Sequence, residues 1–174
     1  MNANRSLKTT IPDIIKYWEV NIYEGDLSID FSEAHERCWR CGYKSKLEKC
    51  HIIPHSLGGP DSPDNYVLLC RICHAEGPNI ADKDFFWDWL KAHATNFYDA
   101  YWITRGMQEY ELVYKKSIVK ELVELNVSPD NIKLLLQEQT NKCSWHFGQP
   151  RMNPATIAGL FYMIVKGLKH KKAT

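Results

Sequence analysis

The chain has 174 residues, a length that fits one globular domain or one small module with an attached second half. It is 44% hydrophobic and 25% charged, which excludes an intrinsically disordered chain. Lys and Arg total 22 against 21 Asp and Glu, so the net charge of +1 excludes a strong overall basic field. No apolar run reaches the roughly 20 residues of a membrane span, and the N-terminus carries no hydrophobic secretory signal. We therefore expect a soluble, cytoplasmic protein without a membrane partner.

The first part of the chain, residues 1–37, is expected to be helical. Pro12 followed by apolar residues at helical spacing predicts a short helix over residues 12–18. A basic cluster follows, made of Arg37, Arg40, Lys44, Lys46 and Lys49. Because local clustering rather than net charge indicates nucleic-acid binding, we predict that these side chains contact DNA phosphates. The alternative is an ordinary solvated surface.

The cysteines predict a metal site. Four of the six form two Cys-x-x-Cys pairs, Cys38 with Cys41 and Cys70 with Cys73. A gap of two residues lets both thiolates of a pair face one ion, and two such pairs complete a tetrahedral Zn²⁺ site. Four sulfur ligands leave no open position, so this zinc is expected to be structural. Cys143 stands apart and is interpreted as a small buried thiol.

The segment between the two pairs predicts a hairpin followed by a helix. The first strand begins near Leu47 and ends at Pro54, and the second covers residues 66–69. A loop rich in Gly, Pro, Ser and Asp joins them. A helix over residues 70–76 then ends at Gly77. We expect a treble-clef-like unit in which zinc replaces the hydrophobic core that so small a unit cannot assemble.

This unit resembles the HNH endonuclease family, whose core is a ββα-metal fold, here with a four-cysteine zinc ribbon. The resemblance extends over residues 38–79 and rests on Cys50-His51-Ile52-Ile53-Pro54, Gly58-Gly59, Asn65 and Leu69-Cys70-Arg71-Ile72-Cys73-His74. The three signature positions of the family fall on His51, Asn65 and His74. The resemblance implies metal-dependent hydrolysis of phosphodiester bonds in DNA. Restriction, homing, phage-packaging and nicking enzymes share this core.

The resemblance also implies a role for each signature residue. His51 is the general base, and an imidazole suits this role because it titrates near neutral pH. His74 holds a catalytic divalent ion (Mg²⁺, Mn²⁺ or another transition metal), and neutral imidazole is a suitable ligand for transition metals. Asn65 braces the loop and so aims the base. An Asn that satisfies an ordinary turn, and a His74 that ligates the structural zinc, are the alternatives.

Cys50 departs from the family pattern. The residue before the base is commonly Asp or His and ligates the metal, whereas a thiolate is soft and poorly matched to Mg²⁺. Cys50 could be a metal ligand, it could only fill space, or another group could complete the site. Strand alternation places Glu48 on the same face as Cys50, and His55 lies just beyond Pro54. We favour a site in which Cys50 is not essential.

The rest of the chain, residues 81–174, is expected to be helical. One helix is predicted behind an Asp82 cap. Further helices are predicted over residues 110–125, 129–139 behind Ser128, and 154–168 behind Asn153, with breaks near Gly106 and around residues 148–150. The fold class is therefore α+β and mostly helical, with an HNH core over residues 38–80 between helical segments at 1–37 and 81–174.

Two basic features of this region could bind DNA. His146 and Arg151 lie beside aromatic residues in the loop before the last predicted helix, an arrangement that suits stacking on bases or contact with phosphate. A loop that packs its aromatic rings on the helical core is the alternative. Lys166, Lys169, Lys171 and Lys172 end the chain and could equally form a solvated tail.

Two functions follow from these features. The leading prediction is a metal-dependent HNH endonuclease acting on DNA, with the helical segments supplying target selection, a homodimer interface, or both. The competing prediction is a non-catalytic zinc module that binds DNA or a protein, its nuclease site having decayed at Cys50. RNA is a weaker substrate candidate because no RNA-recognition signature is visible.

Overall fold

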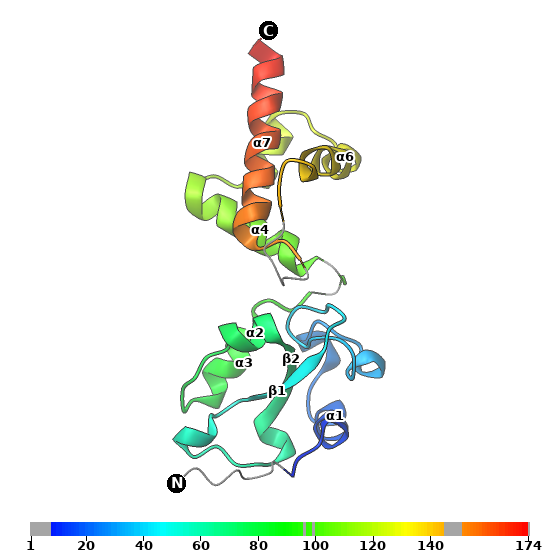
Figure 1. The fold of residues 1–174 in the computed structure, drawn as a ribbon, viewed down its shortest axis with the longest axis vertical. Helices are drawn as coiled ribbons and strands as arrows, with labels where there is room; N and C mark the ends of the chain where they lie inside the picture. The colour runs from blue at the N-terminus through cyan, green and yellow to red at the C-terminus, as the bar shows by residue number, and fades with distance from the viewer. Residues whose placement is uncertain (1–7, 96, 99, 145–150, 174) are drawn as a thin grey trace. The chain divides into compact units, whose positions relative to one another are not determined.

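The structure is a computed structural model that describes residues 8–95, 97–98, 100–144 and 151–173. Its contacts divide the chain into two compact units, Met1–Tyr101 and Trp102–Thr174. The helices and strands are α1 (Ile11–Glu19), β1 (Leu47–His51), β2 (Tyr66–Cys70), α2 (Arg71–Glu76), α3 (Lys83–Lys91), α4 (Tyr101–Tyr114), α5 (Ile118–Glu124), α6 (Pro129–Thr140) and α7 (Pro154–Ala173). The expected α+β, mostly helical fold class is confirmed (Figure 1). None of the described helices combines the length and the apolar character needed to cross a bilayer.

The first unit begins with α1, which confirms the helix expected near Pro12. Thr10 caps it, because its side chain accepts a hydrogen bond from the backbone N–H of Asp13, whose carboxylate in turn accepts one from the N–H of Thr10. Helical spacing puts Ile14 and Trp18 on one buried face. The indole N–H of Trp18 donates to the carbonyl of Tyr66 at 2.7 Å, which fastens α1 to the second strand.

The hairpin is the centre of the first unit. β1 and β2 pair antiparallel, with a register that runs from Leu47 opposite Cys70 to His51 opposite Tyr66. Every residue of β2 is buried, since α1 packs against it and α2 packs against both strands (Figure 1). β1 ends at His51 rather than at Pro54, because the N–H groups of the next two residues bond to Asn65 and not to β2.

α2 and α3 complete the first unit. α2 begins directly after β2, so the second cysteine pair lies at a strand-to-helix junction. The predicted cap of α3 is confirmed, because Asp82 Oδ1 accepts a hydrogen bond from the N–H of Phe85 at 2.9 Å. Phe86 and Leu90 of α3 are buried. The division expected at residues 37/38 and 80/81 stays a prediction.

The second unit consists of α4 to α7, and two predictions made for it are wrong. The helix expected over residues 110–125 is interrupted, because Lys115 adopts a φ of 53° between α4 and α5. Gly106 does not break a helix but lies inside α4. A Cβ at Gly106 would lie 2.2 Å from Cγ2 of Ile157, so this glycine permits the close approach of α4 and α7.

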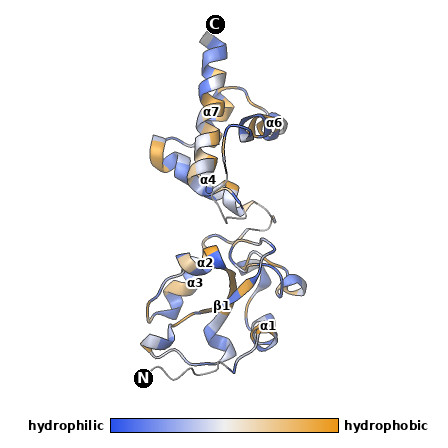
Figure 2. Ribbon diagram, viewed as in Figure 1, coloured by the Kyte–Doolittle hydropathy of each residue, from blue (hydrophilic) through white to orange (hydrophobic). Residues whose placement is uncertain are grey.

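α7 supplies most of the core of the second unit. Its buried residues are Ile157, Ala158, Leu160, Phe161, Ile164 and Val165. The cap predicted at Asn153 is confirmed by a hydrogen bond of 2.8 Å from the N–H of Thr156 to Asn153 Oδ1. α7 extends beyond the predicted end at 168, to Ala173. Figure 2 shows that its ribbon alternates in hydropathy and turns hydrophilic toward the C-terminus.

Candidate active site and metal site

The two cysteine pairs form one four-sulfur cluster. The Sγ atoms of Cys38, Cys41, Cys70 and Cys73 all lie within 4.8 Å of one another, and all four residues are buried. Among the described residues this is the one group of three or more His, Cys, Asp or Glu side chains with ligand atoms gathered in this way. Four buried thiols at this separation are suited to enclosing a metal ion.

A tight turn presents the first cysteine pair. The N–H of Gly42 donates to the carbonyl of Cys38 at 2.8 Å, and Gly42 has a φ of +72°, which favours glycine. A Cβ at Gly42 would also lie 2.7 Å from the carbonyl oxygen of Ser28. The N–H of Trp39 donates to the carbonyl of Leu68, which joins this turn to β2. The turn and the hairpin therefore bring together cysteines that lie about 30 residues apart in the sequence.

His51 occupies the last position of β1. Its ring lies 4.6 Å from the ring of Tyr66, its partner across the hairpin, and is half-buried. Burial lowers the pKa of His51 below its ordinary value of 6.5, and the nearby imidazoles of His55 and His74 lower it further. His51 is therefore neutral at neutral pH, the form in which an imidazole accepts a proton.

Asn65 is buried and holds the loop after β1. Its Oδ1 accepts from the N–H of Ile53 at 2.8 Å, and its Nδ2 donates to the carbonyls of Ile53 at 3.0 Å and Pro60 at 2.9 Å. Only glycine fits at position 59 beside these hydrogen bonds, since a Cβ there would lie 1.8 Å from the carbonyl oxygen of Ile53. Asn65 therefore ties both ends of the loop together directly beyond His51.

His74 projects from α2 toward β1. Its Nδ1 lies 2.7 Å from Oε2 of Glu48, and both side chains are partly exposed. A carboxylate that accepts from Nδ1–H fixes the orientation of the ring and leaves Nε2 as a possible ligand atom. His51 and His74 thus contact different partners, Tyr66 and Glu48. Strand alternation had made the Glu48 carboxylate one candidate for completing the metal site in place of Cys50. The structure places this carboxylate beside His74.

Cys50 is buried in the same region. Only 4% of its surface is exposed, and its Sγ would lie 3.7 Å from a Cβ at Gly77. Burial, and secondarily the carboxylate of Glu48, raise the pKa of the Cys50 thiol to about 12. The thiol therefore packs in the interior, and its role as a metal ligand stays a prediction.

The predicted DNA contact at Arg40 requires a correction. The side chain is 2% exposed and forms an ion pair with Glu76 at 2.5 Å. Its guanidinium also lies 4.1 Å from the centre of the Trp89 ring. Arg40 therefore belongs to the interior of the first unit and is not available to a phosphate.

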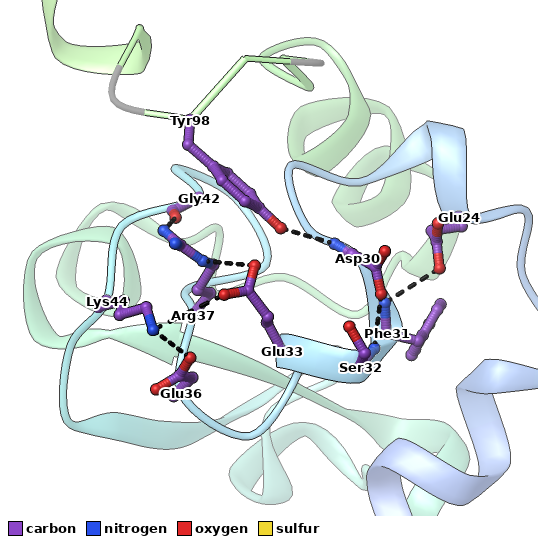
Figure 3. Close-up of polar contacts among 10 residues, drawn as sticks. All are labelled: Glu24, Asp30, Phe31, Ser32, Glu33, Glu36, Arg37, Gly42, Lys44 and Tyr98. Carbon is purple, nitrogen blue, oxygen red and sulfur yellow. Dashed lines mark hydrogen bonds and ion pairs between the residues drawn. The ribbon is translucent and has the colours of Figure 1, made fainter.

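Two more side chains of the predicted basic cluster, Arg37 and Lys44, form contacts with neighbouring groups of the protein (Figure 3). Arg37 donates to Glu33 at 2.9 Å and to the carbonyl of Gly42 at 2.8 Å, and lies 3.7 Å from the centre of the Tyr98 ring. Lys44 pairs with Glu36 at 2.5 Å. Both positive charges are therefore balanced within the protein, which removes much of the local basic field that the sequence suggested.

The remaining predicted DNA contacts lie in different surroundings. Lys49 Nζ donates to the carbonyl of Thr9 at 2.8 Å, whereas Lys46 is exposed. Arg151 lies 5.8 Å from the centre of the Trp102 ring in the second unit. His146 lies outside the described residues.

The pattern of signature residues did not point to Tyr66. Its ring lies against His51, and its O–H donates to Asp61 Oδ1 at 3.1 Å. Asp61 also accepts from the N–H of Lys8 at 2.7 Å, so it links the loop to the segment before α1. The predicted hairpin could have indicated Tyr66 as a neighbour of His51, because the register places the two residues directly opposite each other.

Comparison with known proteins identifies the core. Residues 36–77 match the family model described as HNH endonuclease. The matched segment contains both cysteine pairs, both strands, and the signature positions His51, Asn65 and His74. Searches of curated proteins and of solved structures found no match to this chain. The resemblance inferred from the motif is confirmed for this segment, which is less than half of the chain.

Proposed function

We propose that the chain is a metal-dependent endonuclease that hydrolyses phosphodiester bonds in DNA. One observation carries the proposal: the hairpin and α2 place Nδ1 of His74 2.7 Å from Oε2 of Glu48, a residue of the same strand that ends at His51. The match of residues 36–77 to the HNH endonuclease family supports a nuclease-type function. DNA is proposed as the substrate because the motif resembles that of enzymes that cut it.

His51 acts as the general base in this proposal. Water must lose a proton as it attacks phosphorus, and a neutral imidazole can accept it. The half-buried position of His51 beside Tyr66 keeps the ring neutral and limits its movement. Asn65 acts as a positioning residue, because its three side-chain hydrogen bonds hold the loop that follows His51.

His74 and Glu48 would hold the catalytic metal or orient its ligand. A ring nitrogen and a carboxylate suit Mn²⁺ and other divalent transition metals, and a carboxylate suits Mg²⁺ as well. When bound, a divalent ion neutralises charge on the scissile phosphate and on the leaving oxygen. Cys50 has no part in this proposal, because its thiol is buried and protonated.

The four-cysteine cluster is proposed to hold a structural zinc. Thiolates are soft ligands and strongly favour Zn²⁺ over Mg²⁺ or Ca²⁺. The ion would clamp the turn at Cys38 to the junction of β2 and α2, from which His74 projects. It therefore supports the geometry of the site and leaves no position open for chemistry.

The burial of Cys50 also favours one competing function. If the metal requires a ligand at that position, the unit would be a non-catalytic zinc module that binds DNA or a protein. A homodimer, also predicted for the helical part of the chain, is a separate proposal that sedimentation would test.

A plasmid-nicking assay tests the proposed nuclease. The purified chain is incubated with supercoiled plasmid and Mg²⁺, Mn²⁺ or Ni²⁺, beside His51→Ala, His74→Ala and a matched His35→Ala control. His35 is exposed and is not one of the signature positions. We expect nicking by the native chain and by His35→Ala, with a loss of about 100-fold or more in His51→Ala. The absence of nicking with every ion would favour the binding module, and nicking by His51→Ala at the native rate would reject the assigned base.

A further inference from the structure

The second unit contains a cavity that the proposed nuclease chemistry does not use. It has a volume of about 330 Å³ and is lined by side chains of α4, α5 and α7 and of the α4–α5 connection. Its walls combine three aromatic rings, from Tyr110, Tyr114 and Tyr162, with three amines, from Lys116, Lys166 and Lys169. This volume lies at the lower end of the range of roughly 300–1,000 Å³ that small ligands occupy.

Two of the rings form an exposed aromatic platform, defined as Tyr114 and Tyr162. Their planes differ by 4° and their centres lie 5.5 Å apart, so the two rings are stacked on each other. Tyr114 is 43% exposed and Tyr162 39% exposed. The ring faces turned away from this mutual contact, where they are open to water, offer a stacking surface to another planar ring.

The floor of the cavity is polar and satisfied. The carboxylate of buried Glu121 accepts hydrogen bonds from Tyr110 at 2.7 Å and from Lys169. Burial alone would raise the pKa of Glu121, but these hydrogen bonds outweigh it, so the pKa is lowered and the group is charged. The Glu121 carboxylate at the floor of the cavity is therefore ionised and is held in place by its hydrogen bonds.

The rim carries surplus positive charge. Lys169 is paired with Glu121, and Lys116 is paired with Glu124 at 2.7 Å. Lys166 lies 5.8 Å from the centre of the Tyr162 ring and, within the described part of the chain, forms no ion pair. The last turn of α7, beyond the residues that line the cavity, contains Lys171 and Lys172, and Figure 2 shows this end of the helix as hydrophilic. A free ammonium group beside a stacking surface suits a ligand that is both aromatic and anionic.

We propose that this cavity binds one unpaired nucleotide of a DNA strand, with the base stacked on the Tyr114–Tyr162 platform and a phosphate beside Lys166. Every base has a flat π-face, so such a platform accepts different sequences, and lysine supplies a point charge for the phosphate. The identity of the polymer rests on the proposed nuclease function. The aromatic and cationic character of the site rests on the cavity itself.

Fluorescence anisotropy with a labelled single-stranded oligodeoxynucleotide of about 12 nucleotides tests the proposal. The full chain carries His51→Ala so that the probe is not cut, and no catalytic metal is added. We expect Tyr162→Ala to weaken binding about tenfold and Tyr162→Phe to retain it, because stacking depends on the ring. Lys166→Gln should weaken binding and reduce the slope of log affinity against log salt by about 0.7. Lys133→Gln, at an exposed position on α6 outside the cavity, is the matched charge control and should leave both unchanged.

Three results would overturn the proposal. The first is that the chain with Tyr162→Ala binds the oligodeoxynucleotide as tightly as the chain with Tyr162. If Tyr162→Ala does not fold, Tyr114→Leu is measured in its place. The second is binding of free deoxynucleoside monophosphate without binding of the strand. The third is that a substitution in the cavity changes the sedimentation coefficient of the chain but not its affinity for DNA, which would identify the cavity as part of a subunit interface. Plasmid nicking by the native chain is scored separately, so failure of the nuclease proposal and failure of the cavity proposal give different results.

Discussion

His74 on α2 and Glu48 on β1 are joined by a contact of 2.7 Å between Nδ1 and Oε2. The two residues lie 26 positions apart in the sequence, and the fold of the hairpin and α2 brings them together. The contact fixes one ring nitrogen of His74 and leaves the other for a metal. It is therefore the structural feature on which metal binding by the proposed nuclease depends most directly.

Replacement of Glu48 should weaken metal use. Loss of a carboxylate that ligates or orients a metal ligand typically costs about 10- to 100-fold in metal affinity or activity. We expect Glu48→Ala to raise the Mn²⁺ concentration for half-maximal nicking by about that factor, and Glu48→Gln by less. Glu19→Gln, an exposed residue of α1, serves as the control. An unchanged half-maximal Mn²⁺ concentration in Glu48→Ala would contradict the assignment.

The pH dependence of cleavage should report His51. The base acts in its neutral form, and burial lowers its pKa below 6.5, so the neutral form predominates above a pH that is itself below 6.5. The cleavage rate at saturating metal should therefore be on its plateau at pH 7 and fall about tenfold per pH unit well below the midpoint. A midpoint above 6.5 would contradict the lowered pKa. Rates are measured from about pH 5 to about pH 8 in single-turnover reactions.

Gly59 should tolerate no side chain. The Cβ of Gly59→Ala would collide with the carbonyl oxygen of Ile53 at 1.8 Å and approach Asn65 Nδ2 at 2.8 Å. We expect a destabilisation of about 2–3 kcal/mol and loss of nicking. Gly159 of α7 is the matched control, because a Cβ there meets nothing within 4 Å. Gly159→Ala should raise stability by about 0.5–1 kcal/mol in thermal or urea unfolding, through helix propensity. Equal stability of the two variants would refute this interpretation of the loop.

Removal of one cluster cysteine should abolish the zinc binding proposed for the four-cysteine cluster. Cys70→Ser removes a sulfur ligand from a site whose binding energy is also folding energy, so we expect loss of zinc and a lower melting temperature. Cys143→Ser is the control, because Cys143 lies outside the cluster and its thiol contacts the carbonyl of Thr140. Zinc content by elemental analysis and unfolding by circular dichroism distinguish the variants. Full zinc content in Cys70→Ser would argue against a four-sulfur site.

Local sequence signals predicted the elements whose causes are local. Asp82 and Asn153 cap their helices through side-chain hydrogen bonds to backbone N–H groups three residues away, so short-range spacing was sufficient. The hairpin strands and the helix that follows them were likewise predicted close to their observed bounds. Lys115 shows the opposite case, since nothing in its neighbouring residues indicated a positive φ.

The same contrast applies to the candidate site. The spacing of His51, Asn65 and His74 and of the two cysteine pairs determined the family resemblance. The cysteine spacing also predicted the four-cysteine cluster, because chelation by a Cys-x-x-Cys pair depends on residues that are neighbours in the chain. Only the tertiary structure decided that Arg40 is buried against Trp89 and Glu76, that Glu48 meets His74, and that Gly106 permits a helix contact. Packing between distant segments decides which charges are neutralised and which glycines are needed, and no local pattern contains that information.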